Sequence, residues 1–113
     1  MIVFSLYLHV APEKRVAVLR ILGATLGPTR VAPGCLAVRI LVDIDEGKRF
    51  VLVEEWETRE HFEAYLDAKR LEVIVAVIDL SNEAPIVQID TVMREIGIHN
   101  LPFERLAVRR ATS

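Results

Sequence analysis

The chain has 113 residues, a length that suits one domain with its own core. Hydrophobic residues make up 52% of it, which excludes an intrinsically disordered chain. The formal net charge is −2 and the sequence contains no basic block, so nucleic acid is not expected as the main partner.

Cysteine usage and the N-terminus indicate the compartment. The single Cys35 excludes an internal disulfide and fits a reducing environment. Met1 leads directly into an apolar run without a basic segment before it, so we expect no signal peptide. No apolar run approaches the ~20 residues that a membrane helix needs. The sequence therefore predicts a cytoplasmic protein without a membrane partner.

The first half of the chain predicts a strand, a helix and two further strands. Residues 2–10 alternate between two largely apolar faces, which is typical of a strand. Residues 13–26 carry apolar side chains at helical spacing, and Gly27-Pro28 is expected to end this helix. Strands are predicted over residues 35–43 and 49–57, joined by a turn at 45–48.

The second half is less regular. Thr58 is a candidate N-cap for a short helix with the apolar stripe Phe62, Tyr65 and Leu66. Residues 71–80 have helical spacing, but their many β-branched side chains favour a strand. A last strand is predicted at about 85–94, followed by a short C-terminal helix that includes Phe103 and Leu106.

The common motifs for cofactors, metals and nucleophiles are missing. The sequence has no G-x-G-x-x-G, no Walker A loop and no G-x-S-x-G. His9, His61 and His99 lack paired ligand spacing, which argues against a zinc site. Cys35 has no neighbouring cation in the sequence, so we interpret it as an inert thiol. Neither a cofactor nor a metal is expected.

Two segments resemble one protein family. The run from Gly27-Pro28-Thr29-Arg30 to Pro33-Gly34-Cys35-Leu36 is similar to its helix end and Pro-Gly-Cys strand start. The run Glu54-Glu55-Trp56-Glu57-Thr58-Arg59-Glu60 is similar to its Glu-Trp motif. On these motifs the chain resembles the antibiotic biosynthesis monooxygenase (ABM) family over residues 2–94.

The resemblance implies both a fold and an assembly. It places a helix at residues 71–80, which gives the order β-α-β-β-α-β, an α+β ferredoxin-like unit with an antiparallel sheet that forms a dimeric α+β barrel. We therefore expect one ABM-like domain over 1–113, with a core at 2–94 and a C-terminal extension at 95–113. A homodimer is also expected from the residues, because two helices cover one sheet face while the strands at 2–10 and 35–43 are apolar on both.

The resemblance also implies cofactor-independent oxidation of a small aromatic or quinol-type compound. Alternation places Phe50, Leu52, Glu54 and Trp56 on one face of their strand, and an indole there can stack on a flat substrate and donate its N–H. The alternative is that Trp56 is a packing anchor. The proposed catalytic residues are Trp56, Tyr7 and Tyr65, and the proposed substrate-binding residues are Leu52, Phe62 and His9.

Several positions depart from the family pattern. Leu52 and Phe62 stand where some members have asparagine and tyrosine, and Tyr65 and Arg70 stand where many have histidine. Val75 occupies the position of the histidine ligand in the haem-degrading branch, which disfavours haem. Two hypotheses stay open: a monooxygenase-type oxidoreductase, or a non-catalytic ligand-binding or scaffold domain of the same fold.

Overall fold

The computed structural model describes residues 1–102; the C-terminal helix expected around Phe103 and Leu106 lies outside them. Its elements, in chain order, are β1 (Ile2–His9), a 3-10 turn (Pro12–Lys14), α1 (Arg15–Arg30), β2 (Cys35–Val42), β3 (Arg49–Trp56), α2 (Arg59–Tyr65), α3 (Ala68–Ile78), β4 (Ile86–Thr91) and a second 3-10 turn (Ile98–Asn100). None of the helices in this described part is long and apolar enough to cross a membrane.

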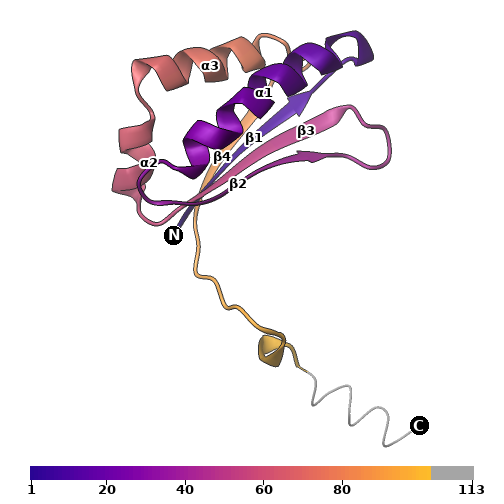
Figure 1. Ribbon diagram of the computed structural model, residues 1–113. Helices are drawn as coiled ribbons and strands as arrows, with labels where there is room; N and C mark the ends of the chain where they lie inside the picture. The colour runs from indigo at the N-terminus through magenta and orange to yellow at the C-terminus, as the bar shows by residue number, and fades with distance from the viewer. Residues whose placement is uncertain (103–113) are drawn as a thin grey trace, which may run out of the picture.

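The strands form one antiparallel sheet in the order β2-β3-β1-β4. The helices α1 and α3 lie over the same face of this sheet, and α2 lies at one end of it (Figure 1). No helix of residues 1–102 lies over the other face. The expected α+β ferredoxin-like order is confirmed, with the second helix divided into α2 and α3.

The core lies between the sheet and the helices. In the register of β1 and β3, Leu6 faces Leu52 and Phe4 faces Glu54, so the apolar rows of the two inner strands coincide. Glu54 is the one charged side chain in the β3 row. The buried apolar residues of this layer are Ile2, Phe4, Leu6, Leu8, Val18, Leu22, Val38, Phe50, Leu52, Trp56, Phe62, Ile74 and Val77.

The expected end of the first helix is wrong. The helix continues through Gly27-Pro28 to Arg30, four residues beyond the predicted end. Pro28 is exposed and has no N–H to donate to the carbonyl of Ala24. The additional turn buries Thr29, whose hydroxyl lies 2.9 Å from the Tyr65 hydroxyl. A tertiary hydrogen bond and burial thus outweigh the local helix-breaking tendency of proline.

Side-chain caps begin both helices after β3. The Thr58 hydroxyl accepts a hydrogen bond from the His61 backbone N–H at 3.2 Å, which confirms the predicted N-cap. Asp67 accepts likewise from the Arg70 N–H at 2.8 Å and begins α3. The segment after Asp67, for which the sequence left helix and strand as alternatives, is therefore helical. Its buried side chains are Arg70, Ile74 and Val77.

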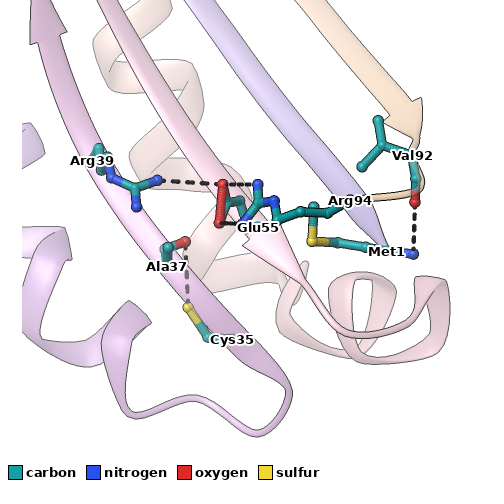
Figure 2. A network of polar contacts seen from close by, with 7 residues as sticks. All are labelled: Met1, Cys35, Ala37, Arg39, Glu55, Val92 and Arg94. Carbon is teal, nitrogen blue, oxygen red and sulfur yellow. Dashed lines mark hydrogen bonds and ion pairs between the residues drawn. The ribbon is translucent and has the colours of Figure 1, made fainter. Parts of the chain in front are cut away.

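An ion-pair cluster closes one end of the uncovered sheet face. The Glu55 carboxylate of β3 accepts a hydrogen bond from Arg39 of β2, with 3.3 Å between Nη1 and Oε1 (Figure 2). It also accepts one from Arg94, in the segment after β4, with 3.0 Å between Nη1 and Oε2. The pair between Arg39 and Glu55 is a cross-strand contact, because the two residues lie on neighbouring strands. Backbone hydrogen bonds between Met1 and Val92 hold the same end of the sheet.

Candidate functional site

The residues proposed as a site from the sequence lie on both faces of the sheet. Trp56 and Leu52 point toward the helices, where α2 supplies Phe62 and Tyr65. Tyr7 and His9 pair with Val51 and Arg49 and therefore point to the uncovered face. Within one subunit the structure brings four of the six residues together and separates Tyr7 and His9 from them.

Three of the four residues on the helix side, Trp56, Phe62 and Tyr65, form an aromatic cluster. Trp56 is 0% exposed, and its ring lies 5.1 Å from that of Tyr65 and 6.4 Å from that of Phe62, centre to centre. Phe62 in turn packs against Phe4 at 5.5 Å. Leu52 and Phe62 are fully buried core residues. Of the four, only Tyr65 also reaches a cleft.

A buried ion pair lies directly behind the aromatic cluster. The Glu54 carboxylate, 2% exposed, binds the guanidinium of Arg70, which is 6% exposed. The indole N–H of Trp56 donates to Glu54 Oε1 at 3.2 Å. The N–H that the sequence assigned to a substrate oxygen is therefore engaged by the protein itself.

Burial controls the protonation of this carboxyl group. Desolvation raises the pKa of Glu54, and the positive charge of Arg70 and the Trp56 N–H oppose that rise. The same negative charge acts on Cys35: burial first, and then Glu54, raise the pKa of its thiol. Cys35 is thus partly buried and held in its unreactive thiol form, as the sequence indicated.

A cleft of about 630 Å³ lies between α1 and α3. This volume lies within the ~300–1,000 Å³ typical of small-molecule sites. Tyr65 and Arg70 line it, with the Arg70 guanidinium 5.2 Å from the centre of the Tyr65 ring. The other lining residues are Arg20, Ile21, Ala24, Thr25, Pro28, Asp67, Lys69 and Val73. The cleft thus joins apolar walls to a phenol and several cations.

Tyr7 and His9 line a separate hollow of about 100 Å³ on the uncovered face. Its volume corresponds to about three waters, at ~30 Å³ each in the liquid. Among the described residues, His9 Nδ1 is buried without a hydrogen-bond partner. The hollow is too small for an aromatic ligand within one subunit. The described residues also contain no group of three or more histidine, cysteine, aspartate or glutamate side chains arranged to hold a metal.

Sequence reasoning missed the role of Arg70 and of Thr29. Two signals were present: Glu54 shares a strand face with Leu52 and Trp56, and Arg70 precedes Ile74 by one helical turn on the buried side of α3. A carboxylate in an apolar row requires a buried cation. Which cation supplies it depends on how α3 packs, and only the structure shows this.

The sequence model of the family described as "Antibiotic biosynthesis monooxygenase" (ABM) matches residues 1–77, from β1 almost to the end of α3. The chain belongs to the ABM family. No curated protein sequence matches it significantly.

Solved structures share the ABM fold. A protein from Deinococcus radiodurans, named as an antibiotic biosynthesis monooxygenase, is 18% identical with a TM-score of 0.77, covering 87% of this chain and 98% of its own. A protein from Mycobacterium tuberculosis is 22% identical with a TM-score of 0.74, over 85% and 98%. One from Nitrosomonas europaea, with the same family name, is 26% identical with a TM-score of 0.73, over 83% and 100%. This chain spans nearly the full length of each.

Proposed function

We propose that this ABM protein is a cofactor-independent monooxygenase that oxidises a small aromatic or quinol-type compound in the cleft between α1 and α3. One observation carries the proposal: a mostly apolar cleft of about 630 Å³ has the Tyr65 phenol and the buried Arg70 guanidinium at one end. Family membership supplies the reaction class. A flat ligand fits such walls, and the polar end fixes its orientation.

In this reaction the substrate supplies the electrons. A phenol or hydroquinone loses a proton and its electron-rich anion reduces O₂. One oxygen atom enters the product, and the other leaves as water with the two protons that the substrate has lost, so the substrate supplies all four electrons. The residues of the cleft have three tasks: to exclude water, to orient the ring and to stabilise the anion. Ile21, Ala24 and Val73 supply apolar walls, and Arg70 supplies a fixed positive charge.

Tyr65 and Trp56 take different roles in this proposal. The Tyr65 hydroxyl, held by Thr29 at 2.9 Å, is the group that contacts substrate. Trp56 is a positioning residue, because its ring packs on Tyr65 at 5.1 Å and its N–H holds Glu54. Leu52 and Phe62 support this cluster from within the core.

Oxygen consumption tests the proposal. Metal-free and flavin-free protein is assayed with an oxygen electrode against a panel of hydroquinones and polycyclic phenols. We expect turnover that falls at least tenfold in Tyr65→Phe, which keeps the ring and removes the hydroxyl. Trp56→Phe is expected to lower kcat more than it raises KM, because it removes the N–H that positions Glu54. No turnover with any compound that binds would refute the enzyme assignment.

A second candidate is a non-catalytic ligand-binding domain. Its supporting observation is that Leu52 and Phe62, which replace polar residues of other members, are fully buried and leave the cleft without those two groups. The two candidates differ in one measurement. Saturable binding of phenols without oxygen uptake supports the binding domain, and binding with uptake supports the enzyme.

We also propose that two copies associate through the uncovered sheet face. This face presents apolar side chains that include Ile86 and Leu41, which are 60% and 50% exposed. An antiparallel sheet normally buries at least one apolar face, and here the second face also carries apolar side chains, Val51 and Val53 among them, next to polar ones. The Glu55 ion-pair cluster in Figure 2 marks one end of this surface.

Light scattering tests the association. Val53→Glu places a charge near the centre of the uncovered face, between Ser5 and Arg39, and is expected to give a monomer at micromolar concentration. Ile44→Glu, in the exposed turn between β2 and β3, is the matched control and is expected to leave the dimer intact. A monomeric wild-type protein would refute the proposed dimer.

A further inference from the structure

Only part of the hydrogen-bonding capacity of the Arg70 guanidinium is used by the described residues. Nη2 binds Glu54 Oε2, whereas Nε is buried and has no hydrogen-bond partner among the described residues. A guanidinium has five N–H donors in a rigid fork that matches a carboxylate in two-point contact. The side chain is more than nine-tenths buried and lines the cleft. Arg70 therefore lines the cleft with a buried positive charge whose hydrogen-bonding capacity the described residues use only in part.

The charges around the cleft have one dominant sign. Arg20, Lys69 and Arg70 are cationic, and Asp67 is the one acidic side chain among the lining residues. Asp67 is already engaged, since its carboxylate caps α3 through the Arg70 N–H. The remaining lining is largely apolar. Such a surface favours a ligand that combines a flat apolar body with a negative charge.

We propose that the cleft binds an aromatic carboxylate, with Arg70 as its counter-ion and Glu54 as the group that takes up a proton when the ligand binds. This inference rests on the proposed function for the location of the site, and it narrows the substrate class from phenols in general to phenols that carry a carboxylate.

Proton uptake follows from two anions sharing one cation. When a ligand carboxylate binds Arg70, Glu54 has a second negative charge nearby and a weaker share of the guanidinium. The groups that face Glu54 are Arg70 from α3, the thiol of Cys35 from β2 and the indole N–H on its own strand. From β1 it faces Phe4, which offers no charge. Because burial already raises the pKa of Glu54, this carboxyl group, and not the ligand, takes the proton.

Calorimetry with a matched pair of probes tests the inference. 2-Naphthoate and 2-naphthamide have the same ring system and nearly the same shape, and only the first is charged at neutral pH. We expect wild-type protein to bind the naphthoate at least about tenfold more tightly, since hydrogen bonds to charged groups contribute more than neutral ones. Titrations in two buffers with different ionisation enthalpies measure the protons taken up, with an expected value of up to one per ligand.

Variants of the ion pair separate binding from folding. Glu54→Gln frees Arg70, so naphthoate affinity is expected to rise and proton uptake to disappear. Glu54→Gln with Arg70→Met leaves no lone buried charge, and both probes are expected to bind equally. Lys48→Met removes an exposed cation from the turn between β2 and β3, outside the cleft lining, and is expected to change the preference less than threefold. Opposite effects of the two ion-pair variants are not expected from a purely structural ion pair.

Three results would overturn the inference: equal affinity for the two probes in wild-type protein, an unchanged preference in the double variant, or no binding of either probe at millimolar concentration. None of them depends on turnover. A protein that oxidises neutral quinols but shows no preference for the naphthoate would retain the proposed function and lose this inference.

Discussion

Arg70→Met leaves the Glu54 carboxylate alone among apolar side chains. Methionine has about the length of the arginine stem, so the change mainly removes the positive charge. Removing one member of a buried ion pair typically costs about 3–5 kcal/mol, because the remaining charge is left uncompensated. Glu54 is 2% exposed and fits that case. The loss is a large fraction of the ~5–15 kcal/mol by which domains are stable.

The cost depends on pH in a direction that follows from linkage. Burial raises the pKa of Glu54 in the folded protein, and without Arg70 nothing but the Trp56 N–H opposes this rise. A carboxyl with a raised folded pKa binds its proton more tightly in the folded than in the unfolded state. Stability therefore falls as pH rises above the unfolded value of about 4.3, by about 1.4 kcal/mol per pH unit, until Glu54 ionises in the folded protein. Below that unfolded value the electrostatic cost is absent.

Urea unfolding at pH 5 and pH 8 measures this difference. The single Trp56 reports on the core by fluorescence, with far-UV circular dichroism as a second probe at the same protein concentration. We expect the variant to lose more stability, relative to wild type, at pH 8 than at pH 5. Glu54→Gln combined with Arg70→Met should recover most of the loss and its pH dependence. An equal loss at both pH values would show that Arg70 stabilises by packing, and would refute the reasoning.

Two further predictions concern the N-cap and the open sheet face. Thr58→Ala removes the acceptor for the His61 N–H and should cost about 1 kcal/mol in urea unfolding, whereas Thr58→Ser should remain near wild type. The hydrogen bond from Arg94, aided by the charges of Arg94 and Arg39, lowers the pKa of Glu55. The contribution of the ionised Glu55 carboxylate to folding stability is therefore present above its unfolded pKa of about 4.3. It is lost as the pH falls through the lowered pKa of the folded protein. Glu55→Gln should destabilise by up to about 1 kcal/mol at pH 7 and less at pH 4, and an effect that grows on acidification would contradict this assignment.

The strands β1, β2 and β3 were predictable because their signal is local, whereas β4 ends at Thr91, three residues before its predicted end. Alternation of apolar residues predicted β2 and β3 to within one residue at each end. The end of α1 was not predictable, because local chemistry at Pro28 favours a stop and the structure retains the last turn through Thr29 and Tyr65, 36 residues apart. The ends of helices and strands that depend on such distant contacts cannot be predicted from periodicity.

In the candidate site, too, local features were predictable from the sequence and those that depend on distant contacts were not. Alternation correctly grouped Leu52 with Trp56, and the same rule places Tyr7 and His9 on one face of β1. It did not show that these pairs face opposite ways, because that depends on the register between β1 and β3, which more than thirty residues separate. A hairpin with a short turn fixes such a register locally, and this pairing has no such turn.

The Glu54–Arg70 pair is a charged pair in an otherwise apolar core, and it borders the cleft. Apolar residues of similar volume usually stabilise a core as well as a buried ion pair does, so stability alone gives little reason for a charge in the β3 row. Elsewhere this row is apolar, with Phe50, Leu52 and Trp56. The pair differs from the rest of the core in that its arginine lines the cleft, and the Nε of this arginine has no hydrogen-bond partner among residues 1–102. In the proposed complex a ligand carboxylate binds the Arg70 guanidinium from the cleft, which gives the pair a role that packing alone does not.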